Sequence, residues 1–269
     1  MSSTYLYGGN VHANHIRQHY LRYGGGKSPL LLVPGITSPA PTWGFVAERL
    51  GKHFDVYVLD VRGRGLSEHG ETLDYGVNAC ADDVTAFVQA MKLENVTLLG
   101  HSMGARIALR AVARGLRDVA SLVLVDPPVS GPGRRSYPAQ LNWYVDSIKL
   151  ARKGMDAEQM KAFCPTWTEG QRQLRAQWLH SCDLRAVIES YEWFHTDEAI
   201  SDFRQLSDIP TALMVAGRGD VIRDEDIQEI QQLKADLIVQ KVPEAGHMIP
   251  WDDEEGFFRE LATYWNQSF

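Results

Sequence analysis

Short apolar runs alternate with stretches of helical periodicity along most of the chain. Residues 16–23 alternate between apolar and polar as a half-exposed strand does. Continuous apolar runs, typical of buried strands, predict further strands at 29–33, 55–59, 96–99, 121–125, 211–215 and 237–242. Helical spacing predicts helices at 42–50, 78–91, 103–114 and 254–265. This alternation indicates an α/β fold with a mostly parallel sheet flanked by helices.

One segment, residues 127–207, departs from this alternation. Its pattern predicts helices without strands, so we expect an inserted helical cap over a core made of residues 1–126 and 208–269. Four of the seven tryptophans lie in the segment: Trp143, Trp167, Trp178 and Trp193. They either pack the cap onto the core or line a pocket beneath it.

Composition and charge narrow the classes of protein that fit. The 269 residues are 44% apolar, which is enough for a core, and their formal net charge of −7 argues against nucleic acid as a partner. No run approaches 18 apolar residues and no signal peptide is recognisable, so we expect a cytoplasmic protein that does not bind membranes. The three cysteines are widely spaced, which predicts neither a disulfide framework nor a zinc site.

The candidate chemistry starts at residues 100–104, Gly-His-Ser-Met-Gly, between a predicted buried strand and a predicted helix. In the pattern G-x-S-x-G, the serine occupies a sharp strand-to-helix turn with its hydroxyl exposed. The glycines leave room for that turn, and the helix N-terminus favours developing negative charge. We therefore predict that Ser102 is a nucleophile, against the alternative of an ordinary turn. His101 would point away from the site and is interpreted as structural.

A serine nucleophile needs a base and an acid that orients the base. His247 is the candidate base because it lies late in the chain, between the last predicted strand and the last predicted helix. Two aspartates at strand ends could orient it, Asp126 and Asp220, and the residues alone leave both open. Asp126 could instead cap a turn before two prolines, and Asp220 could be a solvated loop residue or a helix cap.

Two backbone N–H groups are expected to form an oxyanion hole. Met103 supplies one because it follows the nucleophile, and Ile36, in the loop after strand 29–33, is the candidate for the other. The glycine-rich loop at 60–67 lacks the Gly-Lys-Ser/Thr ending of a phosphate-binding loop and does not open a helix. We interpret this loop as one that defines the fold rather than one that binds phosphate.

These motifs resemble the α/β-hydrolase superfamily over nearly the whole chain. The matching segments are Val-Pro-Gly at 33–35, Asp-x-Arg-Gly-x-Gly-x-Ser at 60–67, the serine motif at 100–104 and Gly-His at 246–247. Pro34 stands where the superfamily usually has a histidine, which leaves the oxyanion donors intact. Longer stretches are similar to the N-formylmaleamate deformylases, at 33–40, 42–50, 100–106, 126–135 and 246–253.

The resemblance to these deformylases implies a hydrolase of a linear amide C–N bond. Such an enzyme converts N-formylmaleamate into maleamate and formate in aerobic nicotinate breakdown, with a Ser-Asp-His triad and without metal or cofactor. The family's acid corresponds to Asp126, and an aspartate matching Asp220 is not required, which favours Asp126. The substrate carboxylate calls for a cation or a helix N-terminus. Arg134 and Arg135 are candidates, although both could be ordinary surface arginines.

Other functions stay open for a small-molecule substrate. An esterase or a carbon–carbon bond hydrolase of another small carboxylated compound would use the same machinery. Epoxide hydrolases and dehalogenases place an aspartate at the position of Ser102, which argues against them. A non-catalytic ligand receptor on this fold would need neither base nor acid.

Overall fold

The centre of the fold is one eight-stranded sheet in the order β1-β2-β4-β3-β5-β6-β7-β8. A computed structural model describes residues 2–206 and 209–269 of the chain. β1 and β2 pair antiparallel, β2 pairs antiparallel with β4, and the other neighbours are parallel. The strands are β1 (Tyr5–Ala13), β2 (Ile16–Tyr23), β3 (Pro29–Val33), β4 (Asp55–Leu59), β5 (Val96–His101), β6 (Val119–Val125), β7 (Thr211–Ala216) and β8 (Ile238–Val242).

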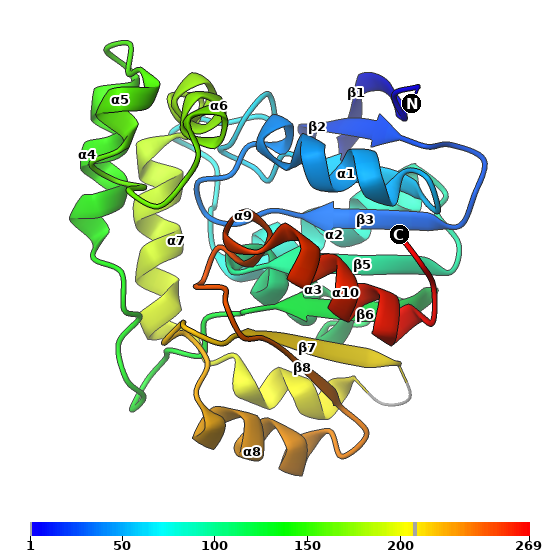
Figure 1. Cartoon of the computed structure of the whole chain (residues 1–269). Coiled ribbons are helices and arrows are strands. Elements are labelled where there is room, and N and C mark those ends of the chain that lie inside the picture. The colour runs from blue at the N-terminus through cyan, green and yellow to red at the C-terminus, as the bar shows by residue number, and fades with distance from the viewer. Residues whose placement is uncertain (1, 207–208) are drawn as a thin grey trace.

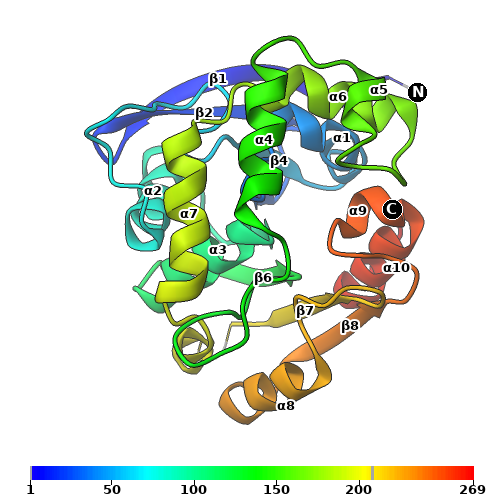
Figure 2. The ribbon, with the colours of Figure 1, turned by 90° about the vertical axis from the view of Figure 1, so that its left-hand side faces the viewer.

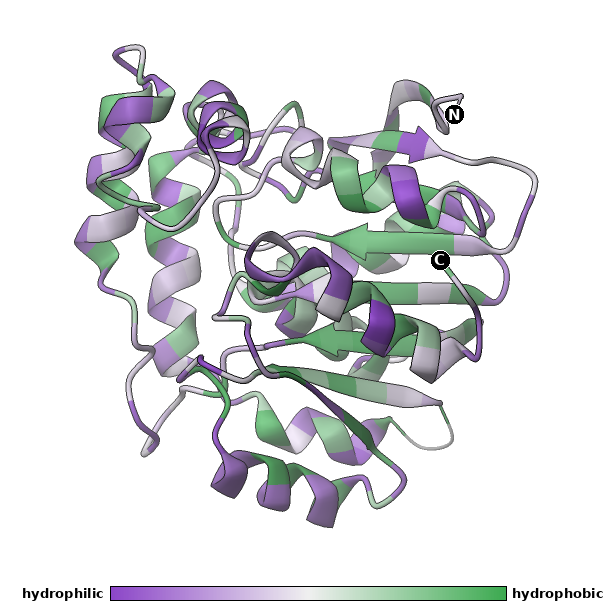
Figure 3. Cartoon of the chain, in the orientation of Figure 1, coloured by the Kyte–Doolittle hydropathy of each residue, from purple (hydrophilic) through white to green (hydrophobic). Residues whose placement is uncertain are grey.

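Helices cover both faces of this sheet. α1 (Gly44–Leu50) and α10 (Glu254–Trp265) lie on one face, and α2 (Val77–Ala90) and α3 (Met103–Ala113) lie on the other (Figures 1 and 2). The central strands are therefore apolar along most of their length, as the hydropathy colouring shows (Figure 3). This arrangement confirms the predicted α/β fold with a mostly parallel sheet.

Each predicted strand and helix is present, with ends that differ by a few residues. The segment predicted as one helix at 42–50 divides into the 3-10 helix η1 (Ala40–Trp43) and α1. β1 was not predicted, because it lies at the sheet edge and most of its side chains are exposed, so it shows no clear alternation. The short helix α9 (Ile249–Asp252) was not predicted either. Between β7 and β8 the chain forms the helix α8 (Asp224–Leu233).

The connection between β6 and β7 contains no strand within the described residues. Four of its helices, which we call the helical insertion, lie beyond the carboxyl ends of the parallel strands (Figure 1). They are α4 (Leu141–Ala151), α5 (Ala157–Met160), α6 (Glu169–Leu179) and α7 (Leu184–Thr196), and the 3-10 helix η2 (Ile200–Gln205) follows them. The division into core and cap stays a prediction, and its boundary at 207/208 lies outside the described residues.

The loops at the carboxyl ends of the strands therefore face the helical insertion. Ligands of open parallel sheets bind at this edge, so a functional site is expected between the two. None of the helices in residues 2–206 and 209–269 combines the length and apolarity needed to cross a membrane.

Candidate active site

Ser102 occupies the turn between β5 and α3. Its backbone has φ 54° and ψ −119°, a conformation that residues other than glycine rarely adopt. Close packing holds the turn in place, because a Cβ atom on Gly100 would lie 2.4 Å from the Gly104 carbonyl oxygen. A Cβ atom on Gly104 would lie 1.9 Å from the carbonyl oxygen of Val33. Only glycine fits at either position, which explains both glycines of the G-x-S-x-G motif.

Ser102, His247 and Asp126 form one hydrogen-bonded chain. His247 Nε2 lies 2.9 Å from Ser102 Oγ, and His247 Nδ1 lies 2.6 Å from Asp126 Oδ2. Asp126 follows β6 with φ 47°, a left-handed conformation that aspartate tolerates, and its side chain is buried. When this carboxylate holds the proton of His247 on Nδ1, Nε2 is free to accept the serine hydroxyl proton.

The other candidate acid lies apart from this chain. The Asp220 carboxylate is exposed and accepts two hydrogen bonds from the Arg223 guanidinium, at 2.6 and 2.9 Å. In the described chain, the acidic side chain that contacts His247 Nδ1 is Asp126, not Asp220.

His101 supports the loop that carries His247. Its Nε2 donates a hydrogen bond of 2.9 Å to the His247 carbonyl oxygen, and its ring packs against Trp43 and Trp251. Burial, together with the nearby His247, lowers the pKa of His101 to about 3. His101 is therefore neutral at ordinary pH, which agrees with a structural role. The expectation that it points away from the site was wrong, because His101 lines the pocket and its ring centre lies 5.2 Å from that of His247.

The N–H groups of Ile36 and Met103 have no hydrogen-bond acceptor in the described part of the protein. Met103 begins α3, where the first N–H groups have no partner within the helix. The fully buried Arg64 supports both residues, since its Nε donates to the Ile36 carbonyl oxygen at 3.0 Å and its Nη2 lies 3.5 Å from Met103 Sδ. The glycine-rich loop at 60–67 thus braces the backbone beside Ser102.

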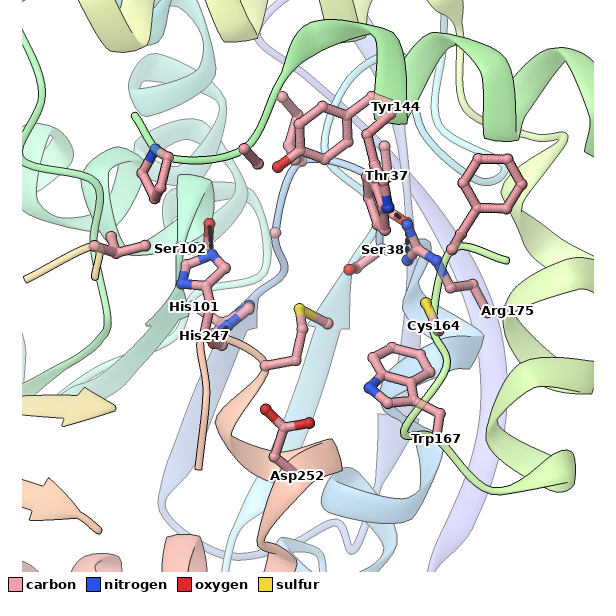
Figure 4. Close-up of a pocket in the computed structure, with 18 of the residues that line it drawn as sticks. Thr37, Ser38, His101, Ser102, Tyr144, Cys164, Trp167, Arg175, His247 and Asp252 are labelled. Carbon is pink, nitrogen blue, oxygen red and sulfur yellow. Dashed lines mark hydrogen bonds between the residues drawn. The ribbon is translucent and has the colours of Figure 1, made fainter. Parts of the chain in front are cut away.

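A pocket of about 520 Å³ opens beside Ser102, between the sheet and the helical insertion (Figure 4). Trp143 of α4 and Trp167, which lies between α5 and α6, line it together with Tyr144 and Phe163. Trp193 instead packs against the buried Arg106, so these three tryptophans divide between the two expected roles.

Tyr137 is a polar group at the site that the sequence did not single out. Its hydroxyl oxygen lies 3.1 Å from His247 Nε2 and accepts a hydrogen bond of 3.3 Å from the Tyr144 hydroxyl. Burial raises the pKa of Tyr137 well above its usual range, so the phenol keeps its proton. The residue lies in an irregular segment, where neither periodicity nor a motif could have marked it.

The cations predicted for a substrate carboxylate lie elsewhere. Arg134 and Arg135 both pair with the buried Asp226, and neither belongs to the described pocket lining. The one arginine or lysine among the described lining residues is Arg175, from α6. Within residues 2–206 and 209–269, no cluster of three or more His, Cys, Asp or Glu side chains is placed to hold a metal ion.

Comparisons with known proteins identify relatives of this chain in both sequence and structure. The family model of the alpha/beta hydrolase fold matches residues 28–254. N-formylmaleamate deformylase of Pseudomonas putida is 59% identical over 262 residues, which cover 97% of each chain. The crystal structure of the N-formylmaleamic acid deformylase from Pseudomonas putida strain S16 matches with a TM-score of 0.91 and 55% identity, over 95% of this chain and 100% of that one. The crystal structure of E-2-(acetamidomethylene)succinate hydrolase, with a TM-score of 0.78 and 20% identity over 97% of this chain and 99% of that one, is similar in fold alone.

Proposed function

Because the chain belongs to the α/β-hydrolase fold family and, within it, to the N-formylmaleamate deformylases, we propose that it hydrolyses N-formylmaleamate to maleamate and formate. The observation that carries the choice of substrate is the 59% identity over 97% of both chains. The hydrogen-bonded chain from Asp126 through His247 to Ser102 supports a serine hydrolase mechanism. The reaction would belong to aerobic nicotinate degradation.

In the proposed first step, Ser102 attacks the formyl carbon of the substrate. His247 Nε2 takes the hydroxyl proton as the new C–O bond forms, and the Asp126 carboxylate stabilises the resulting imidazolium. The carbonyl oxygen becomes an oxyanion, which the N–H groups of Ile36 and Met103 bind. Their lack of an acceptor in the described chain supports this role, since both donors are available to the substrate.

In the second step, the formyl C–N bond breaks and His247 gives its proton to the leaving nitrogen, which releases maleamate. Tyr137 supports this departure, because its hydroxyl lies 3.1 Å from His247 Nε2, beside the place where the leaving group must receive its proton. Water then attacks the formyl-serine while His247 takes one of its protons. Collapse of this second intermediate releases formate and returns the proton to Ser102.

The pocket fits a small substrate of this kind. The formyl carbon carries only a hydrogen atom, so it can reach a serine that is itself only 2% exposed. The remainder of the substrate would occupy the pocket of about 520 Å³ beneath the helical insertion, a volume within the range of small-molecule sites.

A substrate panel tests the proposal against its alternatives. The kcat/KM for formate release from N-formylmaleamate should be at least about 100-fold higher than the kcat/KM for small carboxylated esters or for carbon–carbon ring-cleavage products. Two or three substrate-specific contacts in the pocket are enough for a preference of this size. A higher kcat/KM on an ester or a carbon–carbon substrate would replace the proposed function with that activity. A fluorophosphonate probe that fails to label Ser102 would instead favour a ligand receptor.

A further inference from the structure

Arg175 is a buried cation without an acidic partner among the described residues. Its side chain projects from α6, and the residue is only 5% exposed. Nη1 donates to the Thr37 carbonyl oxygen at 3.3 Å and Nη2 to the Thr37 hydroxyl at 2.9 Å, so both acceptors are neutral. Nε is buried and has no hydrogen-bond partner in the part of the chain that the structure describes. Two of the five N–H donors of the guanidinium are thus used, which leaves three.

The other buried arginines do not share this state. Arg62 and Arg106 each pair with an aspartate. Arg64 has no carboxylate partner within residues 2–206 and 209–269, but oxygen atoms accept from all three of its nitrogens, and it is not among the described lining residues of the pocket. Burying a charge without a counter-charge is costly, and buried charges are normally paired. The open donors of Arg175 therefore indicate that a ligand completes its surroundings.

The surroundings of Arg175 hold its guanidinium in one place. The Cζ atom lies 5.3 Å from the centre of the Trp143 ring and 5.9 Å from that of Trp167, within range of cation–π interactions. Its hydrogen bonds to Thr37 attach the guanidinium to the loop after β3. In this loop, Ile36, the candidate oxyanion donor, directly precedes Thr37. Figure 4 shows Arg175 and Thr37 on one side of the pocket, with Ser102 and His247 on the other.

We propose that Arg175 binds the carboxylate of the substrate. It would thereby select small acyl donors in which a carboxylate lies at a distance from the bond to be cleaved. A guanidinium binds a carboxylate through two parallel hydrogen bonds, and this geometry suits the donors left open on Arg175. Asp252, the one acidic side chain in the described lining, would repel a second carboxylate on its side of the pocket. The identity of the substrate rests on the proposed function, whereas the anion subsite does not.

The test compares the wild type with Arg175→Met and Arg175→Lys on two substrates, N-formylmaleamate and a neutral aryl formate. In Arg175→Met, the ratio of kcat/KM for N-formylmaleamate to that for the aryl formate should fall about 10- to 100-fold, the range expected for a lost charged hydrogen bond, mainly through KM. Lysine should restore part of this ratio because it keeps the charge. The exposed Arg185 on α7 provides the control, since Arg185→Met removes one charge from the insertion and should leave the ratio unchanged.

Inhibition separates the anion subsite from the proposed function. Maleamate should inhibit aryl formate hydrolysis by the wild type, and its inhibition constant should rise about 10- to 100-fold in Arg175→Met. If the wild type does not cleave N-formylmaleamate but shows this inhibition pattern, the proposed function fails and the carboxylate subsite stands. An unchanged ratio, equal loss on both substrates, an equal effect of Arg185→Met, or inhibition independent of Arg175 would each overturn the inference.

Discussion

Replacing Asp126 by asparagine changes one buried contact and little else. The carboxylate oxygen 2.6 Å from His247 Nδ1 holds the ring proton on that nitrogen. An asparagine has nearly the same shape, but its amide nitrogen can donate to Nδ1, which moves the ring proton to Nε2. In that tautomer, Nε2 can no longer accept the proton of Ser102. We therefore expect Asp126→Asn to fold normally and to lose most of its activity.

The size of the loss follows from the burial and the contact distance. Asp126 is fully buried, and with charge centres about 4 Å apart its attraction for the imidazolium is about 4 kcal/mol at an effective dielectric constant of about 20. That energy corresponds to about 10³-fold in rate. The wrong tautomer adds to it, and in serine proteases with this triad the same substitution lowers kcat about 10⁴-fold. The expected loss in kcat is therefore about 10³- to 10⁴-fold.

Steady-state formate release by purified Asp126→Asn, with the melting temperature as a check on folding, measures this loss. Asp220→Asn is the matched control, since Asp220 is exposed and pairs with Arg223. We expect its kcat to stay within about twofold of the wild type, as for other exposed ion pairs. A loss below tenfold in Asp126→Asn, or a larger loss in Asp220→Asn, would refute Asp126 as the orienting acid.

Two further predictions concern the groups around His247. Tyr137→Phe should lower kcat about 3- to 10-fold, the cost of one neutral hydrogen bond, with KM nearly unchanged; an unchanged kcat contradicts a role for the hydroxyl in leaving-group departure. Because the pKa of His101 is lowered to about 3 in the folded protein, the unfolded chain takes up this proton first as the pH falls below 6.5. His101 should therefore lower the free energy of unfolding by about 2 kcal/mol at pH 5 relative to pH 8, as measured by urea denaturation. In His101→Gln this part of the pH dependence should be absent, and its persistence would mean that another group is responsible.

The sequence predicted the parts of the fold and site that depend on local pattern. Buried parallel strands leave continuous apolar runs, and the turn at Ser102 needs glycines at fixed spacing, so both could be recognised without a structure. His247 was predicted from its place after the last strand. The choice between Asp126 and Asp220 needed three-dimensional information, because either strand end could present a carboxylate to that histidine.

The connection between β6 and β7 shows why the remainder could not be predicted. Tyr137 and Arg175 reach the pocket from segments without a motif, and their partners lie far away in the chain. The sequence offered Arg134 and Arg135 as candidates to bind a substrate carboxylate, since nothing in it shows that Asp226 binds both. Tertiary packing alone decides which arginines find hydrogen-bond acceptors for all of their donors within the protein and which keep donors open.

The proposed function requires that Ser102 becomes formylated by N-formylmaleamate and then releases formate. The most direct measurement follows formate production from N-formylmaleamate by the wild type and by Ser102→Ala, with the melting temperature of both proteins as a check on folding. We expect steady formate release by the wild type and a loss of about 10⁶-fold in kcat for Ser102→Ala, as when a catalytic serine is removed from a triad. Formate release by folded Ser102→Ala at a near-normal rate would contradict this requirement.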